Sequence, residues 1–415
     1  MRDILDEPAS GDVDDLMYLS CDEPALPMRL SASTAIMGFH SLSHSLREYH
    51  PSLPRSVALF EVFKENVAPQ VSVFHMPSLI SLFWDSVVSL DTLDKDTEAL
   101  IFALYYSAVV SLDPDDCYRT VGVAQPDIQD TFRFAVEQAL ARADLLNTQS
   151  MVLLQAAVLF LTALRREDAS RTVWSLTALI FHIAQAMGLH HDGNMFGLRP
   201  LETELRRRLW WHICFLDGRS TMYHGCEPIV QEYAFDTQMP LNINDSDLSA
   251  EMNKPPAERE GATDMTFCLV RCEIMKTGWR IGCVPPNRET HRAYNGHWKN
   301  EGFVNREALV RALQQRLHDR YLKHFDMSVP FLRLTAAIVG IIMARLWLTV
   351  HYPVLPDEEV KMSQDVRDRL LVEIVEALEA CACQINDPLL SKWTWHCKTY
   401  TNWSSRSIYH TACSD

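Results

Sequence analysis

Residues 201–225 read LETELRRRLWWHICFLDGRSTMYHG, with Arg206, Arg207 and Arg208 in one run directly before a pair of tryptophans. Basic residues beside aromatic ones are typical of nucleic-acid contacts. Successive residues of a helix point about 100° apart, however, so three consecutive arginines cannot face one groove together. The segment therefore fits a helix of a protein core better than a nucleic-acid contact.

The acidic and apolar residues of this segment also favour a core helix. Glu202 and Glu204 precede Arg206 and Arg208 by four residues, which is the favourable order for ion pairs on a helix. An apolar stripe on the same helix comprises Leu205, Leu209, Trp210, Trp211, Ile213 and Leu216. We therefore expect the tryptophans to join a core and two of the arginines to be paired within the helix.

Two substitutions express this interpretation as stability changes. If Trp210 is buried, Trp210→Ala is expected to lower the free energy of unfolding by about 3–5 kcal/mol. If Arg207 is solvated, Arg207→Ala is expected to lower it by well under about 1 kcal/mol.

The composition is that of an acidic globular protein. The chain has 415 residues, of which 47% are hydrophobic, and a formal net charge of −16. Because an acidic body is repelled by phosphate backbones, we expect no direct DNA binding by this chain alone. Met1 is followed by RDILDEPAS, which lacks the basic and then apolar pattern of a signal peptide.

The eleven cysteines are scattered and form neither CxxC pairs nor a six-cysteine spacing. We therefore predict no zinc site, and no other cofactor, within this chain. Five cysteines lie in apolar stretches and are expected to be reduced thiols of the core: Cys214, Cys268, Cys272, Cys381 and Cys383.

Helical periodicity dominates the chain from about residue 53. Residues 1–50 are acidic and mostly without period, so we predict a disordered leader there and one large all-α domain over residues 51–415. Gly188 is placed to end a helix, because glycine tolerates the left-handed backbone that follows a last helical residue. Long polar loops are expected at 242–264 and 284–303. The expected helices lie within 53–67, 75–90, 94–112, 127–146, 151–167, 169–190, 201–225, 265–281, 306–325, 331–350 and 366–385.

The apolar stretch 331–350 has the length of a membrane span but contains Arg333 and Arg345. An arginine deep in a span is costly, so a buried helix of a large all-α protein is the better interpretation. We predict no transmembrane segment.

Catalytic motifs are incomplete or missing. Two acidic segments come near the metal-binding motifs of terpene cyclases. The first is DPDDCYRT, Asp113–Thr120, which lacks the third acid of the DDxxD motif. The second is NINDSDLSAE, residues 242–251, in which the serine and glutamate are one position out of step with the second metal motif of these enzymes. GLHHDG, Gly188–Gly193, lacks the helical spacing of metal ligands and is predicted to be a structural turn. Nucleophile elbows, phosphate-binding glycine loops and HExxH motifs do not occur in the sequence. We predict that the chain is not an enzyme.

Five motifs occur in this order: AMGLHHDG, ETELRRRLWWHICFLDGRSTMYHGCEP, DTQMPLNINDSDL, TDMTFCLVRCEI and DRYLKHFDMSVPFLRLTAAIVGIIMARLWLTVHYPV. Over roughly residues 50–403 the chain resembles the regulatory middle-homology region of fungal zinc binuclear-cluster transcription factors. The resemblance implies a nuclear, all-α regulatory module in which a separate zinc cluster reads DNA. Zinc is expected only if such a cluster lies outside this chain. The final SSRSIYHTACSD stands where an apolar helix is expected, which suggests a truncated C-terminus.

The residues that carry the resemblance are assigned a structural role and no catalytic, cofactor-binding or metal-binding role. They are Gly188, His190, Asp192, Glu204, Arg206, Arg207, Arg208, Trp210, Trp211, Asp217, Gly225 and Pro240.

The resemblance implies a transcriptional regulator that acts on other regulators or on the transcription machinery, as a homo- or heterodimer, in the control of a metabolic or secondary-metabolite gene cluster. A cavity between its helices is a plausible place for a small-molecule effector. The alternatives are an all-α enzyme of specialised metabolism without a recognisable catalytic motif, and an inactive partner that sequesters a full-length relative.

Overall fold

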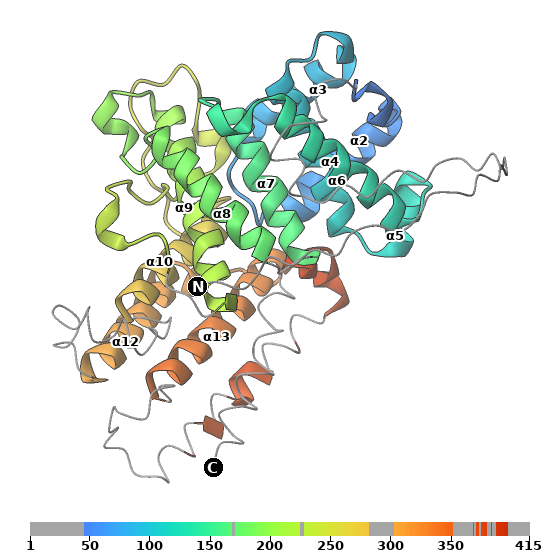
Figure 1. Cartoon of the computed structure of the whole chain (residues 1–415). Coiled ribbons are helices and arrows are strands. Elements are labelled where there is room, and N and C mark those ends of the chain that lie inside the picture. The colour runs from blue at the N-terminus through green and yellow to red at the C-terminus, as the bar shows by residue number, and fades with distance from the viewer. Residues whose placement is uncertain are drawn as a thin grey trace, which may run out of the picture. The chain divides into compact units, whose positions relative to one another are not determined.

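The computed structural model describes residues 45–167, 171–224, 228–281, 303–351 and 387–396, with short pieces between 368 and 383. Every regular element within these residues is a helix, so the all-α prediction is confirmed (Figure 1). Nearly all of the predicted leader, residues 284–302 of the predicted loop 284–303 and most of the predicted helix 366–385 lie outside the described residues, while Phe303 begins α12. The longer elements are α2 Leu53–Val62, η2 Phe63–Val67, α3 Met76–Val88, α4 Lys95–Ser111, α5 Pro114–Val121, α6 Gln125–Arg142, α7 Met151–Glu167, α8 Arg171–Ala186, α9 Pro200–His224, α10 Thr266–Ile281, α12 Phe303–Arg320 and α13 Pro330–His351. Short helical turns are η1 Arg47–Tyr49, η3 Leu90–Thr92, η4 Leu145–Asn147, η5 Gly193–Phe196, η6 Glu232–Ala234, η7 Asp245–Asp247, η8 Leu322–His324 and η9 Pro388–Trp393.

The end of α8 is set by Gly188, as the sequence predicts. Gly188 has a φ of 73°, in the left-handed region that favours glycine. The backbone N–H of Leu189 donates to the carbonyl of Ala184 at 2.9 Å, which satisfies an acceptor that the helix end leaves open. This turn directs the chain back toward α9.

Helix α5 was not expected from the periodicity. The carboxylate of Asp113 accepts from the backbone N–H of Asp116 at 2.8 Å, and Pro114 occupies the first turn, so the helix has a regular N-cap. Gly122, with a φ of 76°, ends it. The first acid of the DPDDCYRT segment is therefore used to start a helix.

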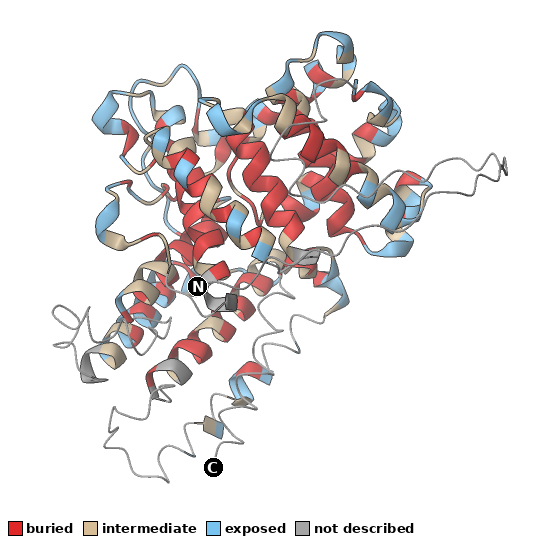
Figure 2. Ribbon diagram, viewed as in Figure 1, coloured by how far each residue is buried: buried red, intermediate tan, exposed pale blue. Residues whose placement is uncertain are grey.

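The core is centred on α4, which packs against α6, α7 and α2. Almost every side chain of α4 is buried, and a helix that is apolar on all sides is typical of a protein interior. The predicted helix 53–67, which forms α2 and η2, is also buried along one side, since Leu59, Phe60, Phe63 and Val67 are at most 2% exposed. Figure 2 shows buried positions running continuously through the central helices.

Helix α13 has the length and composition of a membrane span over Pro330–Trp347, but core helices have the same properties. In this structure α13 packs against α10, α12 and η9. Its residues Leu334, Ile338 and Ile341 belong to a second apolar cluster, together with Phe215 and Phe267 from α9 and α10. The prediction of a buried helix is confirmed for this part of the chain.

The segment at η9 returns to the beginning of the domain. The indole Nε1 of Trp393 donates to the carbonyl of Glu65 at 2.8 Å, and that of Trp395 donates to the carbonyl of Asn66 at 3.1 Å. Residues more than three hundred positions apart in the sequence therefore pack together.

The cysteine predictions are mostly confirmed. Cys214, Cys268 and Cys272 are free thiols buried in the core, whereas Cys383 is exposed. The prediction of a core thiol at Cys383 is therefore wrong, because the apolar residues around it do not place its own side chain in the core. Cys381 lies outside the described residues.

Candidate functional site

The three arginines of the opening segment lie in the first half of α9 and point to three different sets of acceptors. Arg206 donates through Nη2 to the carbonyl oxygen of Met187 at 2.8 Å. This places a cation at the C-terminal end of α8, where it complements the negative end of the helix dipole. Burial lowers the pKa of Arg206, and the nearby Glu202 opposes that change. Glu202 thus acts on Arg206 through its charge, but the ion pair expected from their spacing is not among the contacts that the structure describes for Arg206.

Arg207 forms a buried, two-pronged ion pair with Asp192. Its Nε lies 2.8 Å from Oδ2 and its Nη2 lies 2.9 Å from Oδ1. The two side chains are only 6% and 5% exposed. The condition that Arg207 is solvated is therefore not met, so the small loss of stability expected under that condition does not apply to Arg207→Ala. Paired hydrogen bonds of this geometry are among the strongest in proteins.

Asp192 also holds the loop that runs from η6 toward η7. Its Oδ2 accepts from the backbone N–H of Gln238 at 3.0 Å, and its Oδ1 accepts from that of Asn194 at 3.2 Å. Burial favours a raised pKa for Asp192, but the hydrogen bonds from Arg207, Gln238 and Asn194 outweigh it and lower the pKa. The GLHHDG segment is thus a structural turn, as predicted, and its aspartate is the residue that joins it to α9.

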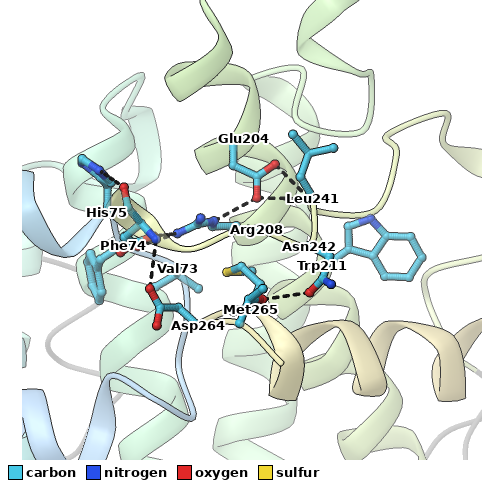
Figure 3. Close-up of polar contacts among 12 residues, drawn as sticks. Val73, Phe74, His75, Glu204, Arg208, Trp211, Leu241, Asn242, Asp264 and Met265 are labelled. Carbon is cyan, nitrogen blue, oxygen red and sulfur yellow. Dashed lines mark hydrogen bonds and ion pairs between the residues drawn. The ribbon is translucent and has the colours of Figure 1, made fainter. Parts of the chain in front are cut away.

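Arg208 lies deeper still and has three acceptors (Figure 3). It donates to Glu204 Oε1 at 3.0 Å, to Asp245 Oδ1 at 2.6 Å and to the carbonyl of Phe74 at 3.0 Å. Arg208 and Glu204 are each 1% exposed, so the ion pair predicted from their spacing is present and fully buried. Burial opposes the charge of Arg208, but the two carboxylates outweigh it and raise the pKa of the guanidinium.

The carboxylates bound to Arg208 hold distant backbone segments. Glu204 accepts from the backbone N–H of Leu241, directly after the buried Pro240, at 3.2 Å. Asp245 accepts from the backbone N–H of Met76 at 2.7 Å through its second oxygen. The backbone N–H of Asp245 in turn donates to Asp264 at 2.9 Å. One arginine therefore links the start of α3, the helix α9 and the long loop before α10.

The two tryptophans are core residues. Trp210 is 1% exposed and lies between the rings of Phe181 and Phe235, with centroids 5.6 and 5.5 Å away. Trp211 is 3% exposed, and its indole N–H donates to the carbonyl of Gln238 at 2.9 Å. Trp211 therefore fixes the same loop that Asp192 holds.

The remaining residues of the predicted set occupy the edges of this network. The carbonyl of His190 accepts from the backbone N–H of Asp236 at 3.0 Å, and burial lowers the pKa of the His190 ring. Asp217 accepts from the backbone N–H of Val230 at 3.0 Å, and burial raises its pKa to about 6. Gly225 lies outside the described residues.

Arg207 and Arg208, with their partners Asp192, Glu204 and Asp245, therefore form a clamp that holds the surrounding loops on α9. Arg207 and Arg208 are buried, and their hydrogen bonds are directed to this chain's own carboxylates and carbonyls. A nucleic acid needs solvent-accessible donors along a groove or a backbone, and these two side chains do not provide them. The helical argument from the sequence is confirmed, while the partners Asp192 and Asp245 were not identified from the sequence.

The acidic segments considered as metal motifs have structural partners as well. Asp245 binds Arg208, and the carboxylate of Asp247 forms an ion pair with Arg259. Within the described ranges, the side chains of His, Cys, Asp and Glu do not form a group of three that could hold a metal ion.

Residues 61–276 match the fungal specific transcription factor domain, and the chain belongs to this family. The match runs from the end of α2 into α10 and therefore includes the whole clamp around α9. The resemblance inferred from the five sequence motifs is confirmed.

Several characterised proteins are similar to the chain over most of its length. The aurofusarin cluster transcription factor aurR2 of Gibberella zeae is 32% identical over 360 residues, covering 86% of this chain and 52% of that protein. The pyriculol/pyriculariol biosynthesis cluster transcription factor 1 of Pyricularia oryzae is 32% identical over 351 residues, covering 83% of this chain and 46% of that protein. The C6 finger domain transcription factor hasF of Aspergillus fumigatus is 29% identical over 420 residues, covering 90% of this chain and 53% of that protein.

The chain spans about half the length of these relatives. No solved structure matches it significantly.

Proposed function

We propose that this chain is the regulatory part of a transcription factor that controls a fungal secondary-metabolite gene cluster. The observation that carries the proposal is its similarity, over more than four fifths of its length, to proteins named for the aurofusarin and pyriculol clusters. The target genes are expected to form one contiguous group of biosynthetic genes, and the site of action is the nucleus.

Contacts with proteins or effectors, and not with DNA, are the proposed mode of action. The net charge of −16 opposes association with a phosphate backbone. The positive charge of the segment that suggests DNA binding is concentrated in its arginine run. Two of these arginines, Arg207 and Arg208, are buried in ion pairs. DNA reading is assigned to a part of the transcription factor outside this chain, and regulation, not catalysis, to this one.

A tethering experiment tests the regulatory role. The full chain is fused to an unrelated DNA-binding domain and directed to a reporter promoter in a filamentous fungus. We expect reporter transcription to change severalfold, up or down, relative to the DNA-binding domain alone. Equal transcription with and without the chain, at equal protein levels, would contradict the proposal.

Two variants make the tethering result specific to the folded domain. Arg207→Ala breaks the buried pair with Asp192 and is expected to abolish the effect on transcription. Arg311→Ala removes an arginine whose side chain is 71% exposed on α12 and is expected to keep it. A transcriptional effect that both variants retain equally would show that the folded clamp is not needed.

A further inference from the structure

An open groove lies where α12 packs beside α10 (Figure 1). Its volume is about 470 Å³, which is within the range of small-molecule sites in proteins. The residues that line it carry charges of both signs. They are Glu273 of α10 and Ala312, Gln315, Arg316, Asp319 and Arg320 of α12.

Two arginines of the groove share one carboxylate. Arg316 Nε lies 3.5 Å from Glu273 Oε2, and Arg320 Nη1 lies 3.6 Å from Glu273 Oε1. Both distances are longer than those of strong charge-assisted hydrogen bonds. Arg320 has a second acid, Glu258, at 3.3 Å, whereas Arg316 has the hydroxyl of Thr277 at 3.3 Å. Arg316 therefore has a share in one carboxylate among the described residues, and its side chain is 49% exposed.

Asp319 places a negative charge close to Arg316. The two residues are three positions apart on α12 and are therefore neighbours on its surface. They do not pair with each other, since Arg316 is turned toward α10 and the Asp319 carboxylate accepts from Gln315 Nε2 at 2.7 Å. Gln315 is neutral, and in the part of the chain that the structure describes Asp319 has no ion pair. The groove thus presents a guanidinium and a carboxylate side by side.

The rest of the groove suits an apolar group. Most of its wall is carbon, as expected where the methylene stems of long polar side chains lie along a surface. Ala312 lies one helical turn before Arg316, and its short side chain leaves room next to the charged pair. A ligand that fits this arrangement has two adjacent opposite charges and an apolar substituent.

We propose that the groove between α10 and α12 binds an α-amino acid with an apolar side chain. Arg316 binds the carboxylate of the ligand, Asp319 binds its ammonium group, and the apolar side chain lies beside Ala312. A guanidinium fork matches carboxylate geometry, and the three donors of an ammonium match an aspartate. An anion alone is repelled by Asp319 and a cation alone by Arg316, so both ligand charges are needed. Binding does not depend on the regulatory function proposed above, whereas any role of the ligand as an effector does.

The test compares zwitterionic probes with analogues that lack one of the two charges. L-Leucine is compared with isocaproate, which lacks the ammonium group, and with isoamylamine, which lacks the carboxylate. L-Phenylalanine, hydrocinnamate and phenethylamine form a matching aromatic set. Each analogue is smaller than its amino acid, so a loss of affinity is not caused by a clash. All six are ionised as required at pH 7.

Saturation-transfer NMR on the purified full chain measures these weak affinities by titration. We expect a Kd of about 1 mM or lower for at least one of the two amino acids. Its two analogues are expected to bind at least about tenfold more weakly, because each lacks one charged hydrogen bond.

Asp319→Asn is the informative variant, because it removes the negative charge at an exposed position and keeps the size of the side chain. We expect it to weaken amino-acid binding at least about tenfold and not to weaken binding of the analogue without an ammonium group. Ala312→Gln, also at an exposed position, extends a side chain into the groove and is expected to abolish binding. Arg311→Gln, outside the groove on the same helix, is the matched control and is expected to bind like the parent. Circular dichroism checks that each variant is folded.

Binding of neither amino acid would overturn the proposal, as would an analogue that binds as tightly as its amino acid. Equal affinity in Asp319→Asn and the parent would also overturn it, as would equal losses in Asp319→Asn and Arg311→Gln. Because the assay contains no transcription step, a silent reporter in the tethering experiment does not affect its result. The two proposals can therefore fail independently.

Discussion

Replacing Arg207 by alanine tests the buried pair that joins the GLHHDG turn to α9. The substitution deletes two hydrogen bonds to Asp192, at 2.8 and 2.9 Å, and leaves that carboxylate 5% exposed with its charge no longer compensated by an arginine. Breaking a buried ion pair by removing one partner lowers stability by about 3–5 kcal/mol.

The lower part of this range is expected. Asp192 keeps the backbone N–H donors of Gln238 and Asn194, at 3.0 and 3.2 Å, so its negative charge is still partly solvated by the protein. We therefore expect Arg207→Ala to lower the free energy of unfolding by about 3 kcal/mol. Arg207→Lys keeps the charge but loses the paired geometry, and we expect a loss of about 1–2 kcal/mol.

The assay is urea unfolding of the purified chain at pH 7, followed by circular dichroism. Arg311→Ala serves as the control, because Arg311 pairs with Glu307 at a surface where its side chain is 71% exposed. Exposed pairs contribute at most about 1 kcal/mol. If Arg207→Ala and Arg311→Ala have the same small effect, Arg207 does not hold the turn and the clamp is wrongly described.

Three further changes are expected to have measurable effects in the same unfolding assay. Trp210→Ala should lower stability by about 3–5 kcal/mol, since the side chain is 1% exposed. The control Trp84→Ala, at a side chain that is 43% exposed, should change stability by less than about 1 kcal/mol. Similar losses in the two variants would place Trp210 outside the core. Burial raises the pKa of Asp217 to about 6, so the folded state binds this proton more tightly than the unfolded chain does, and the stability of the parent falls as the pH rises through about 6. Asp217→Asn lacks this titration, so the stability of the variant relative to the parent should rise by about 2 kcal/mol from about pH 4 to pH 8. A stability difference that stays constant over that range would contradict this. Gly193→Ala should be destabilising, because its Cβ would lie 2.7 Å from Thr203 Oγ1 and 3.0 Å from Thr203 Cα. Gly218→Ala, where a Cβ meets nothing within 4 Å, should stabilise α9 by about 0.5–1 kcal/mol. The reverse order would show that η5 and α9 are not in close contact.

The sequence was sufficient for the features that depend on local geometry. Helical spacing predicted the Glu204–Arg208 pair, the buried tryptophans and the glycine at the end of α8. These interactions span at most one helical turn, so the period of the chain determines them directly.

The partners of Arg207 and Arg208 across loops could not be found in this way. Asp192 is fifteen positions from Arg207, and Asp245 is thirty-seven from Arg208, so their contacts depend on how the loops fold over α9. One signal was present: the residue four positions before Arg207 is Thr203, and the nearer acid Glu204 has the favourable spacing to Arg208 instead, so Arg207 had no acid of its own at that spacing. On a buried helix such an arginine requires a carboxylate from elsewhere.

A basic cluster around Phe215 of α9 gave no sequence signal at all. Its arginines, Arg165, Arg219 and Arg271, come from α7, α9 and α10, which are far apart in the sequence. Only tertiary packing brings these three side chains close to one ring.

The central claim is that the arginine run of α9 holds the domain together and does not contact DNA. Fluorescence anisotropy of a labelled DNA duplex, titrated with the purified chain at low and at physiological salt, tests it most directly. Non-specific DNA binding by a basic surface typically has a Kd of about 10⁻⁴–10⁻⁶ M at physiological salt and strengthens steeply at lower salt. We predict no binding at micromolar concentrations of the chain at either salt concentration. Salt-dependent binding that is lost when Arg206 is replaced by glutamine, in a variant that remains folded, would contradict the account.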